Sequence, residues 1–262
     1  MRNFRIFIPA RLNSSRLPSK LLLRACGKAI ILHTVDAAQK AAASTLLGPY
    51  LQGVYVLTDS VEIKDTVEEY CCKMCYPVSC VYSEHKSGLI RNGSDRIGHH
   101  LWHQFMRTGC LAVNWQADEP LLKVGHIASL VNGYNSVPAC DFHTLIAKAE
   151  VDGSGAECVS PVLGVSRVFH VNSESSKIHT VTSFARSIGG PFRHIGVYAG
   201  SEDAFRWYAG LKPTRSEIEM NLEQMRVLDS GGRINASEVE YDGVPIDTEE
   251  DFGRFCEIVK NM

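Results

Sequence analysis

Three positive side chains follow closely after the first strand-like segment of the chain. Arg11, Arg16 and Lys20 share one polar loop with the run Asn13-Ser14-Ser15. Guanidinium groups bind phosphate oxygens through paired hydrogen bonds, and an ammonium adds a point charge. The loop matches neither the Walker A pattern nor G-x-G-x-x-G. We therefore predict a phosphate-binding loop of a different kind, with a solvated basic turn as the alternative.

Two acidic segments could hold a hard cation. Asp118 and Glu119 follow a strand-like run and precede Pro120, and Asp247 precedes the C-terminal helical pattern. Proteins bind Mg²⁺ through few carboxylates, and water and phosphate oxygens complete its coordination. Each aspartate is also explained as the N-cap of a following helix. The residue types alone leave the metal site and the caps open.

The other polar candidates are dispersed. Ser94-Asp95-Arg96 opens a helix after a glycine-containing loop, and the second half of the chain contributes Arg186, His194, Tyr198, Glu223, Gln224 and Arg226. Taken singly, each of these is explained as a surface group or a satisfied core group. No convincing Ser-His-Asp or Cys-His set is present for nucleophilic catalysis.

The cysteines are nine in number and scattered. Cys72 and Cys75 have the C-x-x-C spacing of zinc or redox sites, but a structural zinc site needs four converging ligands. Residues 61–74 are predicted to be helical, which would fan the thiols from Cys71 to Cys80 apart. We interpret them as small, partly buried hydrophobic side chains.

The elements that must position these residues alternate along the first half of the chain. Strands are expected over residues 4–8, 54–57, 78–82 and 111–115, and helices over 29–43, 61–74, 95–106 and 124–134. This alternation predicts βαβ units whose strands end at one sheet edge, where ligands bind. Further strands are expected over 141–149, 177–185 and 194–199, and helices over 201–210, 221–230 and 248–260. We predict a single α/β domain over residues 1–262 with a small antiparallel extension over about 177–200.

The composition excludes several classes of protein. The chain of 262 residues is 45% hydrophobic and 21% charged, which is typical of a globular protein and not of a disordered, collagen-like or coiled-coil chain. The formal charge of −2 shows no basic surplus, so we expect no nucleic-acid partner. Apolar runs are too short for a membrane span, and the N-terminus does not resemble a signal peptide. We expect a cytoplasmic protein without a membrane partner.

Six ordered sequence blocks together resemble the 3-deoxy-manno-octulosonate (Kdo) cytidylyltransferases, also called CMP-Kdo synthetases, within the sugar-nucleotide transferases. The resemblance extends from Ile8 to Phe252. The blocks are Ile8-Pro9-Ala10-Arg11 with Ser15-Arg16-Leu17-Pro18-Ser19-Lys20, Leu57-Thr58-Asp59, Gln116-Ala117-Asp118-Glu119-Pro120, Arg193-His194-Ile195-Gly196-Val197-Tyr198, Asn221-Leu222-Glu223-Gln224-Met225-Arg226 and Ile246-Asp247-Thr248.

The resemblance implies a three-layer, Rossmann-like nucleotidyltransferase fold with a mixed central sheet, dimeric through the antiparallel extension. It implies Mg²⁺-dependent transfer of CMP from CTP to a Kdo-type acidic sugar, for the biosynthesis of lipopolysaccharide or another surface glycan. Alternatives are another acceptor, such as a second ulosonic or sialic-type acid or another anionic hydroxyl compound, and a non-catalytic nucleotide-binding paralogue.

The resemblance also implies roles for individual residues. The catalytic residues would be Arg11, Lys20, Asp118 and Asp247, with Asp118 and Asp247 as the Mg²⁺ ligands. CTP would contact Pro9, Ala10, Arg11, Ser15, Arg16, Lys20, Ser94, Asp95, Arg96 and Gln116, with the Ser94 loop at the cytosine. The acidic sugar would contact Gln116, Arg186, His194, Tyr198, Glu223 and Gln224.

The chain departs from the family pattern at three points. Residues 89–93 are inserted before Ser94, which changes the loop expected at the base. Ala117 stands where the family has glycine, a change that matters only if the backbone there needs a positive φ. Only residues 187–192 separate Arg186 from Arg193, where the family has a longer loop beside the acceptor pocket. Cytidylyl transfer is therefore better supported by the sequence than the identity of the sugar.

Overall fold

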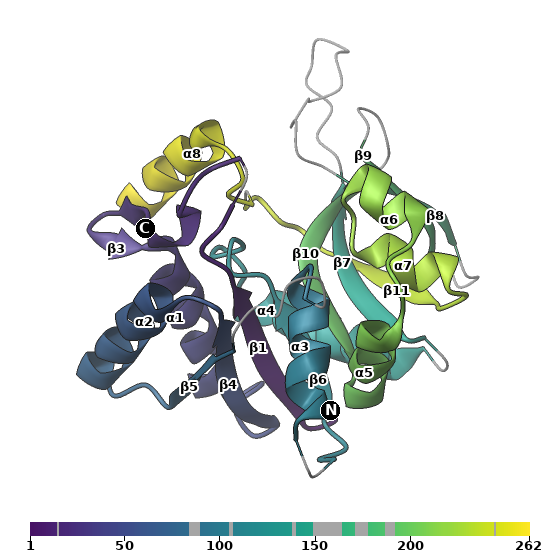
Figure 1. Ribbon diagram of the computed structural model, residues 1–262, viewed down its shortest axis with the longest axis horizontal. Coiled ribbons are helices and arrows are strands. Elements are labelled where there is room, and N and C mark those ends of the chain that lie inside the picture. The colour runs from purple at the N-terminus through teal and green to yellow at the C-terminus, as the bar shows by residue number, and fades with distance from the viewer. Residues whose placement is uncertain are drawn as a thin grey trace.

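A mixed sheet runs through the computed structural model, with its strands in the order β5-β4-β1-β6-β10-β7-β11-β9-β8 (Figure 1). The structure describes residues 1–14, 16–83, 90–104, 107–137, 140–148, 164–170, 178–186, 192–243 and 245–262, with the backbone alone for 164–170 and 185–186. Within these ranges, no helix is long and apolar enough to span a membrane.

The first half of the sheet is parallel, as the alternation of strands and helices predicts. β1 pairs with β4 and β6, and β4 pairs with β5. These strands are β1 (Phe4–Ala10), β4 (Leu51–Thr58), β5 (Val78–Tyr82) and β6 (Leu111–Trp115). The helices that follow them are α1 (Ile30–Ala43), α2 (Val61–Met74), α3 (Gly93–Trp102) and α4 (Val124–Ser136). The loop after β1 and the segment after β6 therefore meet at one sheet edge.

The second half of the sheet is mixed because β10 (Phe192–Ser201) lies antiparallel between β6 and β7 (Phe142–Lys148). β11 (Ile234–Glu238) pairs in parallel with β7 and antiparallel with β9 (Ile178–Arg186). β9 also pairs with β8 (Gly164–His170) to form an antiparallel edge. The predicted mixed sheet is confirmed. The segment expected to form the extension divides, since β9 lies between β11 and the outermost strand β8, whereas β10 lies in the middle of the sheet.

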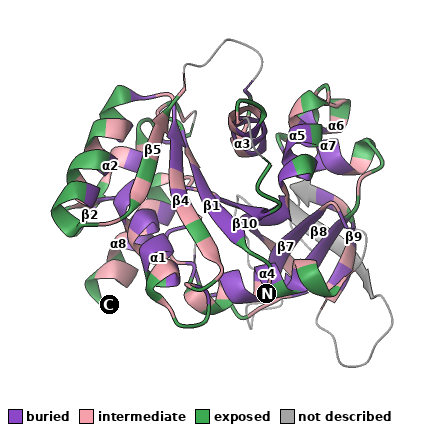
Figure 2. Ribbon diagram, turned by 90° about the horizontal axis from the view of Figure 1, so that it is seen from below, coloured by how far each residue is buried: buried purple, intermediate pink, exposed green. Residues whose placement is uncertain are grey.

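Helices cover both faces of the sheet (Figure 2), and β1 shows how. Ile6 and Ile8 join the apolar cluster that contains α1 and α2, whereas Phe7 between them joins the cluster that contains α3. Successive side chains of a strand point to opposite faces, so a strand buried on both faces is a continuous apolar run.

The remaining elements are η1 (Lys20–Leu22), β2 (Arg24–Ala25), β3 (Lys28–Ala29), α5 (Glu202–Gly210), α6 (Arg215–Met220), α7 (Gln224–Asp229) and α8 (Glu249–Lys260).

Several predicted helices have different bounds in the structure. The helix expected over 95–106 is α3, which begins at Gly93 and ends at Trp102; the Asn92 side chain caps its start by accepting a hydrogen bond from Asp95 N at 2.9 Å. The helix expected over 221–230 is the shorter α7, because Asn221 adopts a left-handed backbone conformation with φ 51° and ends the preceding α6. η1, β2, β3, β8, β11 and α6 were not predicted from the sequence.

The prediction for the cysteines is confirmed at two positions and wrong at two. Cys71 is buried and Cys80 half-buried, and burial raises their pKa to about 11 and about 12. Cys72 and Cys75 are exposed, because Cys72 lies in the last turn of α2 and Cys75 is the residue that ends the helix. All four thiols are free.

Candidate active site

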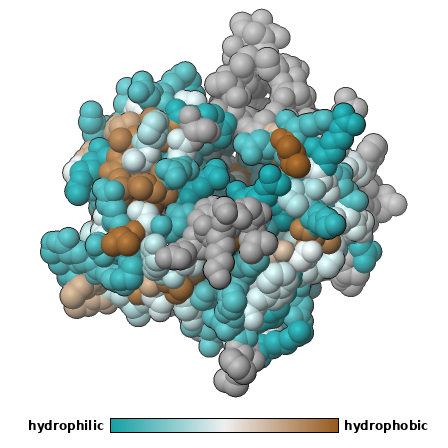
Figure 3. Space-filling view, viewed as in Figure 1, coloured by the Kyte–Doolittle hydropathy of each residue, from teal (hydrophilic) through white to brown (hydrophobic). Residues whose placement is uncertain are grey.

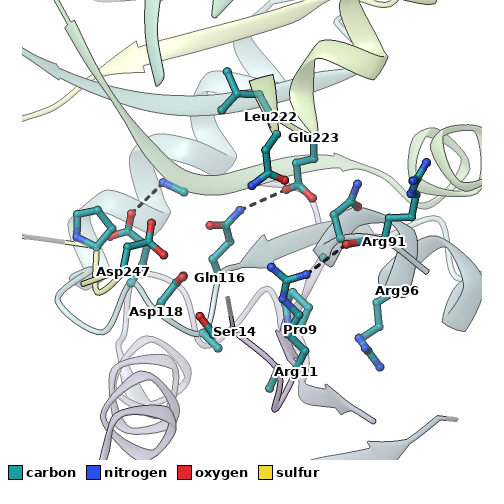
Figure 4. Close-up of a pocket in the computed structure, with 18 of the residues that line it drawn as sticks. Pro9, Arg11, Ser14, Arg91, Arg96, Gln116, Asp118, Leu222, Glu223 and Asp247 are labelled. Carbon is teal, nitrogen blue, oxygen red and sulfur yellow. Dashed lines mark hydrogen bonds between the residues drawn. The ribbon is translucent and has the colours of Figure 1, made fainter. Parts of the chain in front are cut away.

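A cavity of about 420 Å³ opens between the loop after β1, the segment after β6, the N-terminus of α3, strand β10 and the α6–α7 segment (Figure 4). Hydrophilic side chains predominate on the face seen in Figure 3. Most of the predicted site residues line this cavity, namely Pro9, Ala10, Arg11, Arg16, Lys20, Arg96, Gln116, Asp118, His194, Tyr198, Glu223, Gln224 and Asp247. Ser15 and the side chain of Arg186 lie outside the described part of the chain.

The two aspartates predicted to bind a metal converge on one lysine. Lys20 Nζ lies 2.5 Å from Asp118 Oδ2 and 2.9 Å from Asp247 Oδ1, and it also donates to Ile246 O at 2.8 Å. A backbone hydrogen bond of 3.0 Å from Ile246 N to Asp118 O joins the two acidic segments. Burial by itself would lower the pKa of Lys20, but the charges of Asp118 and Asp247 outweigh it and raise the pKa. The ammonium therefore stays charged.

Neither aspartate is a helix N-cap, although the cap expected at Asp247 or Thr248 is present at Thr248. The N-cap of α8 is Thr248, whose hydroxyl accepts from Asp251 N, and not Asp247. The helix after Asp118 is α4, and its N-cap is Lys123. Ala117 has no positive φ, so its replacement of glycine strains nothing. Both aspartates instead line the cavity and bind Lys20.

The donor set suits Mg²⁺. Two carboxylates and a backbone carbonyl converge on one cation, and such oxygen donors are the ligands that Mg²⁺ prefers. Among the described side chains, no group of three or more His, Cys, Asp or Glu residues converges in a way that could hold a metal. A Mg²⁺ ion held by Asp118 and Asp247 would therefore take its other ligands from water and phosphate.

The basic loop supplies cations at the same end of the cavity. Arg16 Nη2 lies 2.9 Å from Asp247 Oδ2, and Arg11 Nη1 donates to Arg91 O at 3.4 Å. Arg96 also lines the cavity, but its guanidinium binds Asp59 at 2.6 Å and points away from the other site residues in Figure 4. Arg11 and Arg16 are thus the guanidinium groups most available to an incoming phosphate.

Ser94 and Asp95, which were predicted to contact the nucleotide, are buried in the first turn of α3 and are not among the residues that line the cavity. The Ser94 hydroxyl accepts from Asn114 Nδ2 at 3.2 Å, and Asp95 binds Arg226. The residues just before them, Ile90, Arg91, Asn92 and Gly93, line the cavity. The contact of Ser94 and Asp95 with the base stays a prediction.

Polar side chains of β10 and α7 form the opposite wall. Tyr198 donates its hydroxyl proton to Gln224 Oε1 at 3.2 Å, and Gln116 Nε2 donates to Glu223 Oε1 at 3.3 Å (Figure 4). Ser94 N donates to Glu223 Oε2 at 3.2 Å. These contacts hold the amide and carboxyl groups in fixed orientations, as recognition of a hydroxylated ligand requires.

His194 is neutral and its tautomer follows from its neighbour. Burial lowers its pKa to about 3. Thr144 Oγ1 donates its single proton to Val197 O at 2.7 Å, so the contact of 3.0 Å between Oγ1 and His194 Nε2 requires the imidazole to donate. His194 Nδ1 is therefore an acceptor.

Two buried carboxyl groups at the cavity have raised pKa values. Burial raises the pKa of Glu223 to about 7 and that of Glu119 to about 7. Glu119 accepts from Tyr241 OH at 2.7 Å and from Gly196 N at 3.1 Å. The sequence placed Glu119 only in an acidic pair with Asp118 that could hold a cation, and in the structure it lines the cavity. The sequence signal that could have singled it out is its position shortly after the buried strand β6.

Comparison with known proteins identifies the family. The cytidylyltransferase family profile matches residues 6–234. The 3-deoxy-manno-octulosonate cytidylyltransferase of Rhodopirellula baltica is 31% identical, and the alignment covers 98% of each chain. The chain belongs to this family. The predicted enzyme class, a nucleotidyltransferase, is thereby confirmed. The 8-amino-3,8-dideoxy-manno-octulosonate cytidylyltransferase of Shewanella baltica is 29% identical over 97% of both chains.

Solved structures share the fold of this cytidylyltransferase. A CMP:2-keto-3-deoxy-manno-octonic acid synthetase complexed with CTP superposes with a TM-score of 0.77 at 23% identity, covering 99% of both chains. A UDP-glucose pyrophosphorylase superposes with a TM-score of 0.63 at 16% identity. The predicted nucleotidyltransferase fold is confirmed.

Glu223→Gln should change how the stability of this cytidylyltransferase depends on pH. Because the folded-state pKa of Glu223 lies above its ordinary value, the native state binds more protons than the unfolded state between about pH 4.5 and 7. The resulting stabilisation is present at low pH and is lost as the pH rises through 7. Wild type should therefore lose roughly 3 kcal/mol more unfolding free energy than the variant between about pH 4 and 8.

Urea unfolding at a series of pH values measures this difference. The exposed Glu62→Gln is the matched control and should follow the wild-type profile. Parallel profiles for wild type and Glu223→Gln would show that Glu223 titrates as an ordinary carboxyl group.

Proposed function

We propose that this enzyme transfers CMP from CTP to a hydroxyl group of a Kdo-type acidic sugar and releases pyrophosphate. The observation that carries the proposal is the arrangement of the cavity: a cluster of cations and carboxylates from Lys20, Asp118 and Asp247 faces, across one space, the ordered polar wall of Gln116 and Glu223. The names of the relatives support the same donor and the same class of acceptor.

The reaction is a displacement at the α-phosphorus. The sugar hydroxyl oxygen forms the new bond to the α-phosphorus and releases its proton to water, the bond from that phosphorus to the bridging oxygen breaks, and pyrophosphate leaves. Such a reaction requires mainly positioning and neutralisation of charge. Arg11, Arg16 and Lys20 would bind the phosphate oxygens and neutralise them. Mg²⁺, held by Asp118 and Asp247, would supply further charge neutralisation at the phosphates.

The polar wall would orient the acceptor. Hydroxyl groups of the sugar can donate to His194 Nδ1 and to Glu223, and the amides of Gln116 and Gln224 can both donate and accept. The guanidinium of Arg186 remains the predicted partner of the sugar carboxylate, because its fork matches that group. The sugar would thus bind at the mostly uncharged wall and the triphosphate at the positively charged loop, so that each substrate occupies a different part of the cavity.

A pyrophosphate-release assay tests the proposal. Four nucleoside triphosphates are combined with Kdo, 8-amino-3,8-dideoxy-Kdo, a sialic acid and carboxyl-reduced Kdo. We expect release only with CTP, and more with Kdo than with its carboxyl-reduced analogue. Equal use of these two would exclude the carboxylate as a recognition element. Preference for the 8-amino sugar would establish the other acceptor that the Shewanella relative's name indicates. No release with any pair would favour a non-catalytic paralogue.

Arg16→Ala should weaken CTP much more than CMP. Its half-exposed guanidinium lies beside Asp247, at the end of the cavity where the outer phosphates would bind. Loss of a charge-assisted hydrogen bond corresponds to about a tenfold to hundredfold loss of CTP affinity, and CMP should change less than about threefold. Calorimetry with both nucleotides measures this. Arg24→Ala, an exposed arginine outside the cavity, is the control. Equal weakening of both nucleotides would refute the placement.

We also propose, on the resemblance alone, a single domain, a homodimer formed through the β8–β9 edge and a cytoplasmic role in surface-glycan synthesis.

A further inference from the structure

A buried guanidinium behind the wall of the cavity links the carboxylate of Asp95 to that of Glu217, a residue that itself lines the cavity. Arg226 Nη1 lies 2.6 Å from Asp95 Oδ1 and Nη2 lies 3.2 Å from Asp95 Oδ2. On its other edge, Nε lies 2.7 Å from Glu217 Oε2 and Nη2 lies 2.6 Å from Glu217 Oε1. The side chains of Arg226 and Asp95 are 1% exposed and that of Glu217 is 8% exposed. The guanidinium carbon also lies 4.3 Å from the centre of the Tyr208 ring.

One end of this triad holds the nucleotide side of the cavity. Asp95 Oδ2 accepts from Arg91 N at 3.0 Å, and Arg91 O in turn accepts from Arg11 of the basic loop. The neighbouring Gly93 lies so close to the end of β1, from which the basic loop continues, that a Cβ atom there would come within 2.8 Å of Pro9 Cγ. The carboxylate of Asp95 therefore fixes the backbone against which the basic loop packs.

The other end holds the acceptor side. Glu217 belongs to α6, and its Oε1 also accepts from Asn92 Nδ2 at 3.2 Å. Arg226 itself lies in α7, one turn after Glu223 and Gln224, which face the cavity. Both short helices are thus joined to α3 by charged hydrogen bonds. Burying such charges is costly, so an apolar contact would serve stability as well or better, but it would fix the relative position of the helices less strictly.

We propose that Arg226 is a positioning residue that sets the distance between the nucleotide side and the acceptor side of the active site. This role rests on the proposed function. The acceptor groups on α7 keep their place relative to the phosphate-binding loop because Arg226 is held from both sides. A displacement of about 1 Å between reacting groups costs up to about a hundredfold in rate. A change at the Glu217 end of the triad therefore acts on the chemical step and on acceptor binding, because Asp95 keeps its hydrogen bond from Arg91 N at the nucleotide end.

Glu217→Gln tests this proposal, with Glu202→Gln as the matched control. Glutamine keeps the shape of Glu217 but replaces one acceptor by a donor facing the guanidinium. Glu202 is similarly buried and binds the buried Arg5, and it does not line the cavity. Glu217→Gln should lower kcat at least about tenfold and raise the acceptor KM at least about fivefold, with the KM for CTP within about twofold. Glu202→Gln should lose stability and keep all three constants within about twofold.

A second measurement does not depend on turnover. CTP binding should slow hydrogen exchange of the α7 amides in wild type and in Glu202→Gln, and this protection should be lost in Glu217→Gln. If Glu217→Gln does not fold, Arg226→Lys is the second variant, and it should lower kcat and lose the protection in the same way. Kinetic constants and protection that match those of Glu202→Gln would overturn the proposal. Absence of turnover in wild type would instead count against the proposed function, and the exchange pattern would still decide the role of Arg226.

Discussion

Asp118→Asn and Asp247→Asn should each lower turnover at least about a hundredfold while the protein remains folded. The two carboxylates converge on one cation in the structure, so each variant removes half of the negative charge that would hold Mg²⁺. Loss of electrostatic stabilisation where charge develops in a transition state has effects of about this size. Steady-state pyrophosphate release at saturating CTP measures the loss, and calorimetry with Mg²⁺ and CTP should show weaker metal binding.

Asp36→Asn is the matched control for these variants. Asp36 forms a partly buried ion pair with Lys28 and does not line the cavity. It should affect stability alone. If both cavity variants kept near-normal turnover, the metal assignment would be wrong, and the aspartates would serve only to neutralise Lys20.

Lys20→Met should move two measurements in opposite directions. Turnover should fall at least about a hundredfold, because the ammonium would no longer neutralise the phosphates. Binding of Mg²⁺ to the nucleotide-free protein should become tighter by about tenfold or more. In the wild type the Lys20 ammonium occupies the point between Asp118 and Asp247, and the variant leaves that point free of a competing positive charge. Methionine preserves the length and most of the volume of the side chain. Metal titration by calorimetry and the pyrophosphate assay measure the two effects.

Lys28→Met removes the partner of Asp36 in the same way and should change neither quantity. Weaker Mg²⁺ binding in Lys20→Met would mean that the metal, if it binds, uses other ligands. Unchanged turnover would show that Lys20 serves only to pair the aspartates and does not contact the phosphates.

The first half of the sheet could be predicted from the sequence because its physical signals are local. β1 is a run of apolar residues that ends at a polar loop, and such runs are typical of strands buried on both faces. The helix predicted over residues 61–74 matches α2 to the residue, since Ser60 caps its start. β11, by contrast, reads Ile-Asn-Ala-Ser-Glu, and this polar run becomes a strand because its neighbours supply its hydrogen bonds.

The chemistry of the site divides in the same way. The residue types in the basic loop and the two acidic segments make phosphate and Mg²⁺ candidate ligands, because charge and donor geometry belong to the side chains themselves, but they leave a solvated turn and helix caps open as alternatives. Their meeting did not follow from the sequence. Asp118 and Asp247 are adjacent only because β6 ends beside the segment that leads to α8, where Ile246 pairs with Asp118. The place of Lys20 between them depends on the same contact.

Burial and pairing depend on the folded chain as a whole. The raised pKa of Glu223 and the lowered pKa of His194 result from burial by residues distant in sequence. Asp95 was itself an expected nucleotide contact, yet in the folded chain its buried carboxylate binds Arg226, which is distant in sequence. The amino-acid order thus specifies which chemical groups the enzyme has and the local elements that hold them. The distances between these groups, their charge states and their partners are decided only by the tertiary structure. They depend on contacts between distant segments, which come together when β10 pairs with β6 and β7.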